Sequence, residues 1–371
     1  MALKLSIGSA IYNLEESFLR EHIEGILGQL TDETELLLID DCSTNHSPDI
    51  CKEYAAKDPR IRYIRMDENS GLSSVRNRTV EEAEGEWIFF ADGDDLFSDY
   101  FISTALKFMD EKYDIIIHER LKFTEQKQPD SPCRVKNTVE LPPQAGKKIS
   151  ISCLCLDPNL GTQLGLPPRA FYHAAWGAFY RKDFLVKNHL LFPVGQKKAQ
   201  DAVFNTRTYF YAQNIAYLPY IMYYYRNNPQ GITHRYTENL QITLASLEKH
   251  LSACMQEYYP HDADVRERFV NHRIMAIIMD NLRLNIFHKD NPKSREQRKR
   301  EYFNFIEEEP YKTAISVFDP QKSGRWEWHL PVKLIQSKNF RLLDFFFGNN
   351  TVFRYTCALD RRVYKKLKGK K

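Results

Sequence analysis

Short apolar runs alternate with amphipathic segments through the first 120 residues of the chain. The segment over residues 15–30 repeats apolar side chains at helical spacing, and three later segments predict helices over 47–57, 73–83 and 101–110. The apolar runs between them are typical of strands, at residues 3–10, 35–39, 61–66, 87–91 and 114–118. Strands that alternate with helices predict a parallel, doubly wound α/β sheet.

This rhythm stops after residue 123. Residues 124–148 contain four prolines among many polar residues, which predicts a long loop or a mobile flap. Regular patterns return at residues 174–188, 201–212 and 215–226. From Tyr236 the composition shifts to helices, predicted over residues 240–258, 263–288 and 294–309. The chain is therefore predicted to have an α/β domain over residues 1–235 and a mainly helical region over 236–371.

The predicted helix over residues 263–288 has one apolar face. This face suits packing against the α/β domain or against a second copy of the chain, which would make the protein a homo-oligomer. The face consists of Phe269, Ile274, Ile277, Ile278, Leu282 and Ile286.

The end of the chain is basic. Residues 354–371 contain eight basic side chains and one acid, and the three phenylalanines at 345–347 precede them. Basic charge beside aromatic anchors fits peripheral attachment to an anionic membrane surface. A solvated basic tail behind buried phenylalanines explains the composition equally well.

Composition limits the class of protein. The chain has 371 residues, 43% of them hydrophobic and 27% charged, so it can bury a large core. Its net charge of only +3 argues against nucleic-acid binding over a broad surface. Seven cysteines without a CxxC pair predict reduced thiols in a cytoplasmic protein. Neither a signal peptide nor a membrane-spanning segment is expected.

Polar residues gather where the predicted strands end. Tyr12 follows the first strand, Asp41 follows the second, and Asp92, Asp94 and Asp95 follow the fourth within the tetrapeptide DGDD. In an open α/β sheet, ligands bind at the carboxyl ends of the strands. Three carboxylates within four residues repel one another, and a divalent cation such as Mg²⁺ or Mn²⁺ would offset that repulsion. An isolated DGDD is more often a solvated turn, but the buried strand before it favours a ligand site.

A calcium loop is the other candidate for this acidic segment. Such a loop needs an oxygen ligand at its fifth position, a glycine at its sixth and a glutamate at its twelfth. These positions hold Leu96, Phe97 and Ser103, which excludes a calcium loop.

Seven short motifs follow one another across about residues 3–235. In order and spacing they resemble the inverting family 2 glycosyltransferases, which have a GT-A fold, and seven in order are far more specific than any one alone. The motifs are Tyr12-Asn13; Asp40-Asp41-Cys42-Ser43; Asn69-Ser70-Gly71 with Val75-Arg76-Asn77; Asp92-Gly93-Asp94-Asp95; Trp176 with Tyr180-Arg181; Gln200-Asp201-Ala202-Val203-Phe204; and Tyr223-Tyr224-Tyr225-Arg226.

The resemblance implies a nucleotide site in the first 120 residues. Tyr12 would stack on the base beside Ala10, and Asp41 would accept a hydrogen bond from a base N–H. Uracil offers such a donor at N3, so a UDP-sugar is the favoured donor. Arg76, near a helix start, would meet the nucleotide or its diphosphate, although an ordinary surface ion pair explains it nearly as well. Asp40 is expected to support the turn.

The resemblance also implies a metal site that uses Mn²⁺ or Mg²⁺. Asp94 would bind the ion directly, Asp92 would face the ribose or the ion, and Asp95 would be a second metal contact or a support. The ion would bridge the diphosphate and stabilise its growing charge. Arg226 and His234 are expected on a loop that closes over the diphosphate, with His234 as a third metal ligand.

Asp201 matches the general base of the family, in an acceptor part over about residues 150–235. It would take the proton of the acceptor hydroxyl, although any aspartate at a helix start can also serve as a cap. The family usually has glutamate before this aspartate, and Gln200 in its place predicts a lower pKa of Asp201. Trp176 is expected mainly in the core, with a wall of the acceptor site as its alternative role.

The sequence thus predicts a metal-dependent inverting glycosyltransferase. Its acceptor would be a hydroxyl of a surface polysaccharide, a teichoic acid or a lipid-linked glycan. A sugar-1-phosphate nucleotidyltransferase would need a glycine-rich phosphate loop after the first strand, where Ala10-Ile11-Tyr12-Asn13 stands instead. A non-catalytic glycan-binding or scaffold protein with the same fold is the alternative from another class. The donor sugar and the role of residues 124–170 are not predicted.

Overall fold

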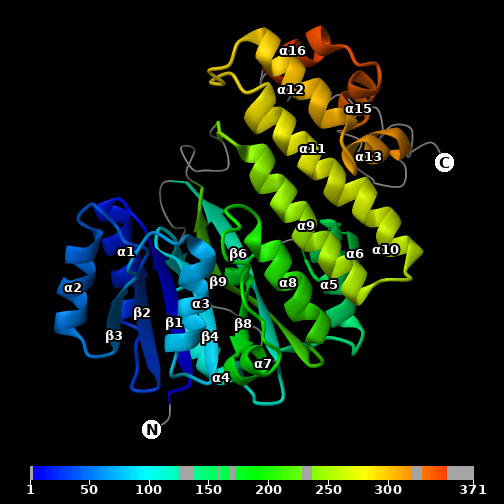
Figure 1. Ribbon diagram of the computed structural model, residues 1–371. Coiled ribbons are helices and arrows are strands. Elements are labelled where there is room, and N and C mark those ends of the chain that lie inside the picture. Colours follow the sequence, from blue (N-terminus) through cyan, green and yellow to red (C-terminus); the bar gives the residue numbers. More distant parts are fainter. Residues whose placement is uncertain are drawn as a thin grey trace. The chain divides into compact units, whose positions relative to one another are not determined.

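The computed structural model describes residues 3–124, 138–157, 159–167, 170, 172–227, 236–319 and 328–348 (Figure 1). The chain divides into two compact units, one of Met1–Cys153 with Pro158–Asn228 and one of Leu154–Asp157 with Pro229–Lys371. The division falls a few residues before the expected boundary at 235. The first unit contains the expected nucleotide part and most of the expected acceptor part. His234 and the basic tail after residue 353 lie outside the described residues.

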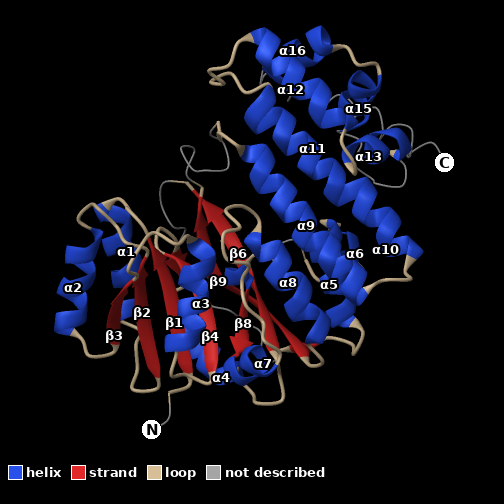
Figure 2. Ribbon diagram, in the orientation of Figure 1, coloured by secondary structure: helices blue, strands red, loops and turns tan. Residues whose placement is uncertain are grey.

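The first unit is built on a mixed sheet. Strands β3, β2, β1 and β4 lie side by side in that order and run parallel (Figures 1 and 2). Strand β8 then pairs antiparallel with both β4 and β6, so the sheet is mixed, while the five strands predicted in the first 120 residues run parallel to one another. The strands are β1 Leu5–Ile11, β2 Thr34–Asp40, β3 Ile61–Arg65, β4 Trp87–Asp92, β5 Leu96–Phe97, β6 Ile115–Phe123, β7 Val139–Glu140, β8 Ala178–Arg181 and β9 Ile215–Arg226.

Helices cover both faces of this sheet, as a doubly wound fold requires. Helices α1, α2 and α4 bury their apolar residues in one core cluster, and α3, α5, α7 and α8 bury theirs in another. The helical elements are α1 Glu16–Leu27, α2 Ser47–Lys57, α3 Leu72–Glu82, α4 Phe101–Phe108, α5 Ala145–Cys155, α6 Asn159–Thr162, the 3₁₀ turn η1 Ala175–Gly177, α7 Lys182–Lys187 and α8 Gln200–Tyr211.

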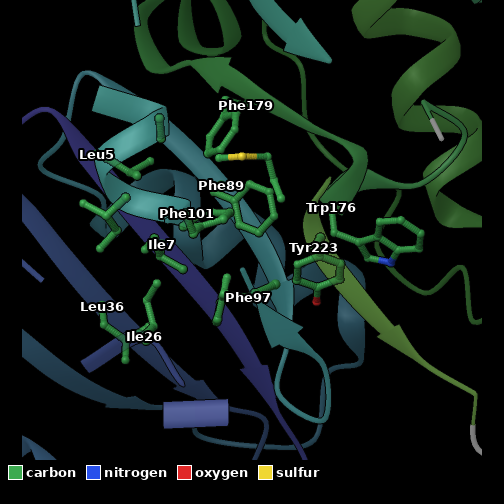
Figure 3. Close-up of a cluster of buried hydrophobic side chains, with 14 of the residues drawn as sticks. Leu5, Ile7, Ile26, Leu36, Phe89, Phe97, Phe101, Trp176, Phe179 and Tyr223 are labelled. Carbon is green, nitrogen blue, oxygen red and sulfur yellow. The ribbon is translucent and has the colours of Figure 1, made fainter. Parts of the chain in front are cut away.

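The strand residues alternate between the two clusters. Leu36 belongs to the first cluster and Leu37 to the second, because successive side chains of a strand point to opposite faces. Both faces of β2 are therefore buried, which explains its continuous apolar run. In Figure 3 the ring of Phe89 in the first cluster lies beside Phe101 and Phe179, with centroid distances of 4.9 and 5.0 Å.

The segment predicted as a loop over residues 124–148 is partly regular. Strand β7 pairs antiparallel with β9, and α5 begins at Ala145. Gly146 in α5 lies against the carbonyl oxygens of Tyr209 and Ala212, where an added Cβ would come within 2.6 Å of each. A glycine at this position is therefore required by the close approach of two backbones.

The second unit is helical. The predicted helix over residues 263–288 forms as a continuous helix from Ala263 to Ile286, with two π-helical stretches. Its apolar face is buried against α9, α12 and α13 of the same unit, so these helices cover the face that the sequence assigned to another domain or a second copy. The elements are α9 Leu240–Tyr258, α10 Ala263–Arg268, η2 Phe269–Ile274, α11 Met275–Asn281, η3 Leu282–Ile286, α12 Arg295–Glu307, α13 Tyr311–Val317, α15 His329–Gln336 and α16 Phe340–Gly348.

Within the described part of the chain, the helices are too short or too polar to cross a bilayer. No disulfide joins the five cysteines that the structure describes, at positions 42, 51, 153, 155 and 254.

Candidate active site

The carboxyl ends of β1, β2 and β4 bring the predicted site residues to one edge of the sheet. Ala10 of β1 is the register partner of Asp92 in β4 and of Ile39 in β2. The N–H of Gly93 donates to the carbonyl of Ala10 at 3.1 Å, which holds the DGDD turn against β1. An added Cβ at Gly93 would come within 2.9 Å of that carbonyl oxygen, so only glycine fits this contact.

The two aspartates after β2 have different partners. Asp40 accepts hydrogen bonds from the Tyr63 hydroxyl at 2.9 Å and from Arg65 at 2.7 Å, as well as from the backbone N–H of Ser43 at 2.9 Å. It therefore supports the turn, as the sequence predicts. Asp41 instead accepts hydrogen bonds from the backbone N–H groups of Ser70 and Gly71.

Asp41 organises the loop before α3. Its two oxygens accept from the N–H groups of Ser70 at 2.8 Å and Gly71 at 2.9 Å, and the side chain is buried. Each carboxylate oxygen keeps a second lone pair, so a base N–H can still be accepted. Tyr12, at the end of the neighbouring strand, is 50% exposed, as a surface for stacking requires.

The acidic turn is short of counter-charge. Burial, followed by the charge of Asp92, raises the pKa of Asp94 to about 6. Burial and the charges of Asp94 and Asp92 raise the pKa of Asp95 well above its ordinary value. Asp95 also accepts from the backbone N–H of Arg226 at 2.7 Å, which fits a supporting role.

Asp92 and Asp94 are the two carboxylates of the turn that could hold a divalent cation. A cation between them would offset the repulsion that raises the pKa of Asp94. Among the residues that the structure describes, no group of three or more His, Cys, Asp or Glu side chains is placed to hold a metal ion. A complete coordination sphere would therefore take oxygens from the diphosphate or from water.

Arg76 brings two of the predicted site residues together. Its guanidinium donates from Nη1 to Oδ1 of Asp201 and from Nη2 to Oδ1 of Asp92 at 2.9 Å. The side chain is 3% exposed, and its guanidinium carbon lies 5.3 Å from the ring centroid of Phe192. Arg76 is thus a buried bridge between two carboxylates, so the alternative of a surface ion pair was wrong.

Asp201 lies in the first turn of α8, beside Gln200. Burial raises the pKa of Asp201, and the Arg76 guanidinium opposes this rise only in part. The lower pKa expected from Gln200 is therefore outweighed by burial. A raised pKa makes the carboxylate a better proton acceptor, while its 22% exposed side chain can still reach a substrate. The structure shows no side-chain cap on α8, although Asp201 could have provided one.

Arg226 differs from its prediction. It is the last residue of β9 rather than part of a closing loop, and it is buried. Its guanidinium lies between the rings of Phe18 and Phe123, and its Nε donates to the carbonyl of Asp94 at 2.7 Å. Nη2 forms an ion pair with Glu21 at 2.6 Å. These contacts make Arg226 a support of the acidic turn.

Trp176 is buried in η1, as expected for a core residue. Its ring stacks on Tyr223 and Tyr225 at centroid distances of 5.3 and 5.4 Å (Figure 3 shows the first pair). The Tyr223 hydroxyl in turn accepts from the backbone N–H of Asp92 at 2.9 Å. The hydrogen bond of Tyr223 therefore connects the aromatic stack to the acidic turn.

Two supporting residues were not predicted from the sequence. Tyr223 was named from the sequence only as a member of the last motif, without a role of its own. His22, buried in α1, places Nε2 2.7 Å from the Ser9 hydroxyl and Nδ1 2.7 Å from the carbonyl oxygen of Asp95. Its only signal in the sequence was a polar side chain on the otherwise apolar face of α1.

Part of the chain matches a family of known proteins. Residues 6–184 match the model of the family described as Glycosyl transferase family 2. These residues form a family 2 glycosyltransferase domain. The predicted family is thereby confirmed, and the domain contains every site residue up to Trp176.

Two proteins of Bacillus subtilis are similar to the chain. The chain is 28% identical over 265 residues to "Putative glycosyltransferase EpsH" of Bacillus subtilis, an alignment that covers 68% of the chain and 69% of EpsH. It is 29% identical to "Uncharacterized glycosyltransferase EpsJ" of the same organism, in an alignment that covers 62% of each protein. The chain thus spans about two thirds of these relatives.

A solved structure shares the fold. Residues 1–349 of Staphylococcus aureus TarS in complex with UDP-GlcNAc match with a TM-score of 0.62 at 18% identity, covering 93% of the chain and 90% of that structure. The predicted GT-A α/β fold is thereby confirmed. In its full length, TarS of Staphylococcus aureus is described as a poly(ribitol-phosphate) beta-N-acetylglucosaminyltransferase, and the chain aligns with 36% of it at 25% identity.

Proposed function

We propose that this glycosyltransferase is an inverting, metal-dependent enzyme that transfers a sugar from UDP to a hydroxyl of a surface glycan. The observation that carries the proposal is the convergence of Asp92 and Asp201 on one buried guanidinium. It puts the proposed base next to the acidic turn that would hold the donor. A single displacement needs a base and a group that holds the donor, and both thus lie within one site.

The donor half of the site is formed by Tyr12, Asp41 and the DGDD turn. Exposed Tyr12 would stack on uracil, and Asp41 would accept the N3–H with its remaining lone pair. Asp92 and Asp94 would hold Mn²⁺ or Mg²⁺, which would neutralise the leaving diphosphate. The UDP-GlcNAc complex of TarS supports the choice of a UDP-sugar.

The base would act in one displacement. As the acceptor oxygen forms its bond to the anomeric carbon, its proton passes to the carboxylate of Asp201. The bond between the anomeric carbon and the diphosphate oxygen breaks on the opposite face, and UDP leaves with the electron pair. One displacement inverts the anomeric configuration.

The acceptor class rests on the relatives. TarS acts on poly(ribitol-phosphate), as its name states, and its aligned region supports an acceptor of the teichoic acid or polysaccharide type. A lipid-linked glycan is the other acceptor that we propose for assay.

The first experiment is a hydrolysis screen of nucleotide sugars with and without Mn²⁺. We expect one UDP-sugar to be hydrolysed, and only with the metal present. Asp94→Ala should abolish this metal-dependent hydrolysis. Hydrolysis at the same rate in a metal chelator would contradict the proposed metal site.

Asp201→Asn tests the base. The amide cannot take up the acceptor proton, so transfer should fall by about 10²–10⁴-fold, the usual contribution of general base catalysis. UDP affinity, measured by titration calorimetry, should stay within about threefold because the donor contacts remain. Wild-type turnover by this variant would remove the base assignment. UDP binding without turnover by the wild-type protein over a broad acceptor panel would instead favour a glycan-binding or scaffold role.

We further propose that the enzyme works at the cytoplasmic face of the cell membrane, attached by the basic segment over residues 354–371. Eight basic side chains against one acid support this attachment. Co-sedimentation with vesicles containing anionic lipid should require the segment, and full binding by a chain that ends at residue 348 would contradict the proposal.

A further inference from the structure

Arg76 is a deeply buried charged side chain of the candidate active site. Three elements that are distant in the sequence meet at its guanidinium. Helix α3 supplies Arg76, strand β4 ends in Asp92, and helix α8 has Asp201 in its first turn. Arg76 and Asp201 are 125 residues apart in the chain. The contact therefore exists only because the fold is complete.

The chemistry of arginine suits a spacer between two carboxylates. Its guanidinium is planar and rigid, and its two terminal nitrogens donate in fixed directions. Nη1 holds Oδ1 of Asp201, and Nη2 holds Oδ1 of Asp92. The ring of Phe192 beneath the guanidinium restricts its plane. A lysine carries the same charge, but its single ammonium cannot reproduce this spacing.

We infer that Arg76 is a positioning residue that holds the base Asp201 at a fixed distance from the donor-binding Asp92. With Oδ1 of Asp201 occupied, the acceptor proton would pass to Oδ2. The inference rests on the proposed role of Asp201 as the base, and it replaces the expected role of Arg76 as a direct nucleotide contact.

The competing role is contact with the diphosphate. Nε of Arg76 has no hydrogen-bond partner among the residues that the structure describes, so a phosphate oxygen is a chemically reasonable partner for it. The two roles predict different kinetics. A diphosphate ligand changes donor affinity, whereas a positioning residue changes the rate of transfer at a nearly constant donor affinity.

The experiment compares Arg76→Lys and Arg76→Gln with the wild-type protein. The measured quantities are the Kd of UDP with Mn²⁺ by titration calorimetry, and kcat and KM for the nucleotide sugar that the hydrolysis screen selects. We expect kcat to fall at least about 30-fold in both variants, while the Kd of UDP and the donor KM change by less than about threefold. Losses of UDP affinity as large as the losses of kcat would overturn the inference.

A double-mutant cycle tests whether Arg76 acts through Asp201. In the Asp201→Asn background, Arg76→Lys should lower the residual rate by less than about threefold, because the group that it positions is already disabled. Full additivity would overturn the inference and leave the base assignment intact. Wild-type activity of Asp201→Asn alone would overturn the base assignment and the inference with it.

The matched control is Arg78→Lys, two residues further along α3. Arg78 forms ion pairs with Glu81 and Glu82 at the protein surface. Its substitution should leave kcat and the UDP affinity unchanged. The melting temperature of each Arg76 variant separates loss of positioning from loss of folding, and restoration of kcat by added guanidinium in Arg76→Gln would support the positioning role directly.

Discussion

Three buried polar side chains contact the acidic turn. His22 contacts the carbonyl oxygen of Asp95, Tyr223 contacts the backbone of Asp92, and Arg226 contacts Asp94. Each of these side chains lies in the interior, where a polar group without a partner is costly. The three side chains therefore stabilise the turn, because the turn provides their hydrogen-bond partners.

His118 gives a pH prediction at the residue scale. It is fully buried among Phe89 and Phe179, and burial lowers its pKa to about 4. The histidine pKa in the unfolded chain is about 6.5. Between pH 6.5 and 4, His118 therefore binds a proton in the unfolded chain but not in the native state. The stability contributed by this residue is present above pH 6.5 and is lost as the pH falls towards 4.

Urea unfolding at pH 7 and pH 5 measures this effect. We expect the wild-type protein to lose about 2 kcal/mol more than His118→Gln over this interval. The matched control is His46→Gln, at an exposed position, which should follow the wild-type protein. An identical pH dependence of His118→Gln and wild type would show that His118 is protonated in the native state.

At the scale of elements, close contact between β1 and the DGDD turn positions the donor site. An added Cβ at Gly93 would lie 2.6 Å from Cδ1 of Ile11 and 2.7 Å from Cδ1 of Leu14, besides its contact with the Ala10 carbonyl. The turn cannot approach β1 this closely with any other residue.

Gly93→Ala should therefore displace the turn. We expect a stability loss of about 1–3 kcal/mol from overpacking. UDP affinity should fall about tenfold, which equals about 1.4 kcal/mol. Urea unfolding and titration calorimetry measure the two effects. Gly25→Ala in α1 is the control: its Cβ would meet nothing within 4 Å, so it should stabilise the helix by about 0.5–1 kcal/mol. Unchanged UDP affinity in Gly93→Ala would contradict the proposed donor site.

At the scale of the whole molecule, the chain enters the helical unit twice. The first entry is the segment Leu154–Asp157, which belongs to the helical unit although it begins with the last two residues of α5. Asp157, 1% exposed, forms an ion pair with Arg268 at 2.9 Å, and Arg273 donates to the carbonyl of Leu154. These contacts anchor a segment of the first half of the sequence within the helical unit.

Asp157→Asn should weaken this anchor without affecting the donor site. Loss of a hydrogen bond between charged groups predicts a stability loss of about 1–3 kcal/mol, visible as a lower melting temperature in scanning calorimetry. UDP affinity should not change. Asp264→Asn removes an exposed partner of the same Arg268 and should cost less than about 1 kcal/mol. Equal losses in the two variants would show that burial of Asp157 adds nothing.

Much of the architecture could be predicted because it is encoded locally. Apolar runs such as Leu36–Ile39 and the helical spacing of residues 15–30 reflect which faces are buried, and the order of the motifs identified the family. The direction of β8 could not be predicted in this way, because a four-residue strand carries no signal of its neighbours' direction.

The sequence by itself determined the alternation of strands and helices, the acidic turn at the end of β4 and the family that residues 6–184 match. Only the tertiary structure decided that Arg76 joins Asp92 to Asp201 and that Arg226 supports the turn from the end of β9. The physical reason is that hydrophobic periodicity depends on residues a few positions apart, whereas these ion pairs and hydrogen bonds depend on the path of the whole chain. A buried arginine and an exposed one look the same in a sequence until the carboxylates around them are placed.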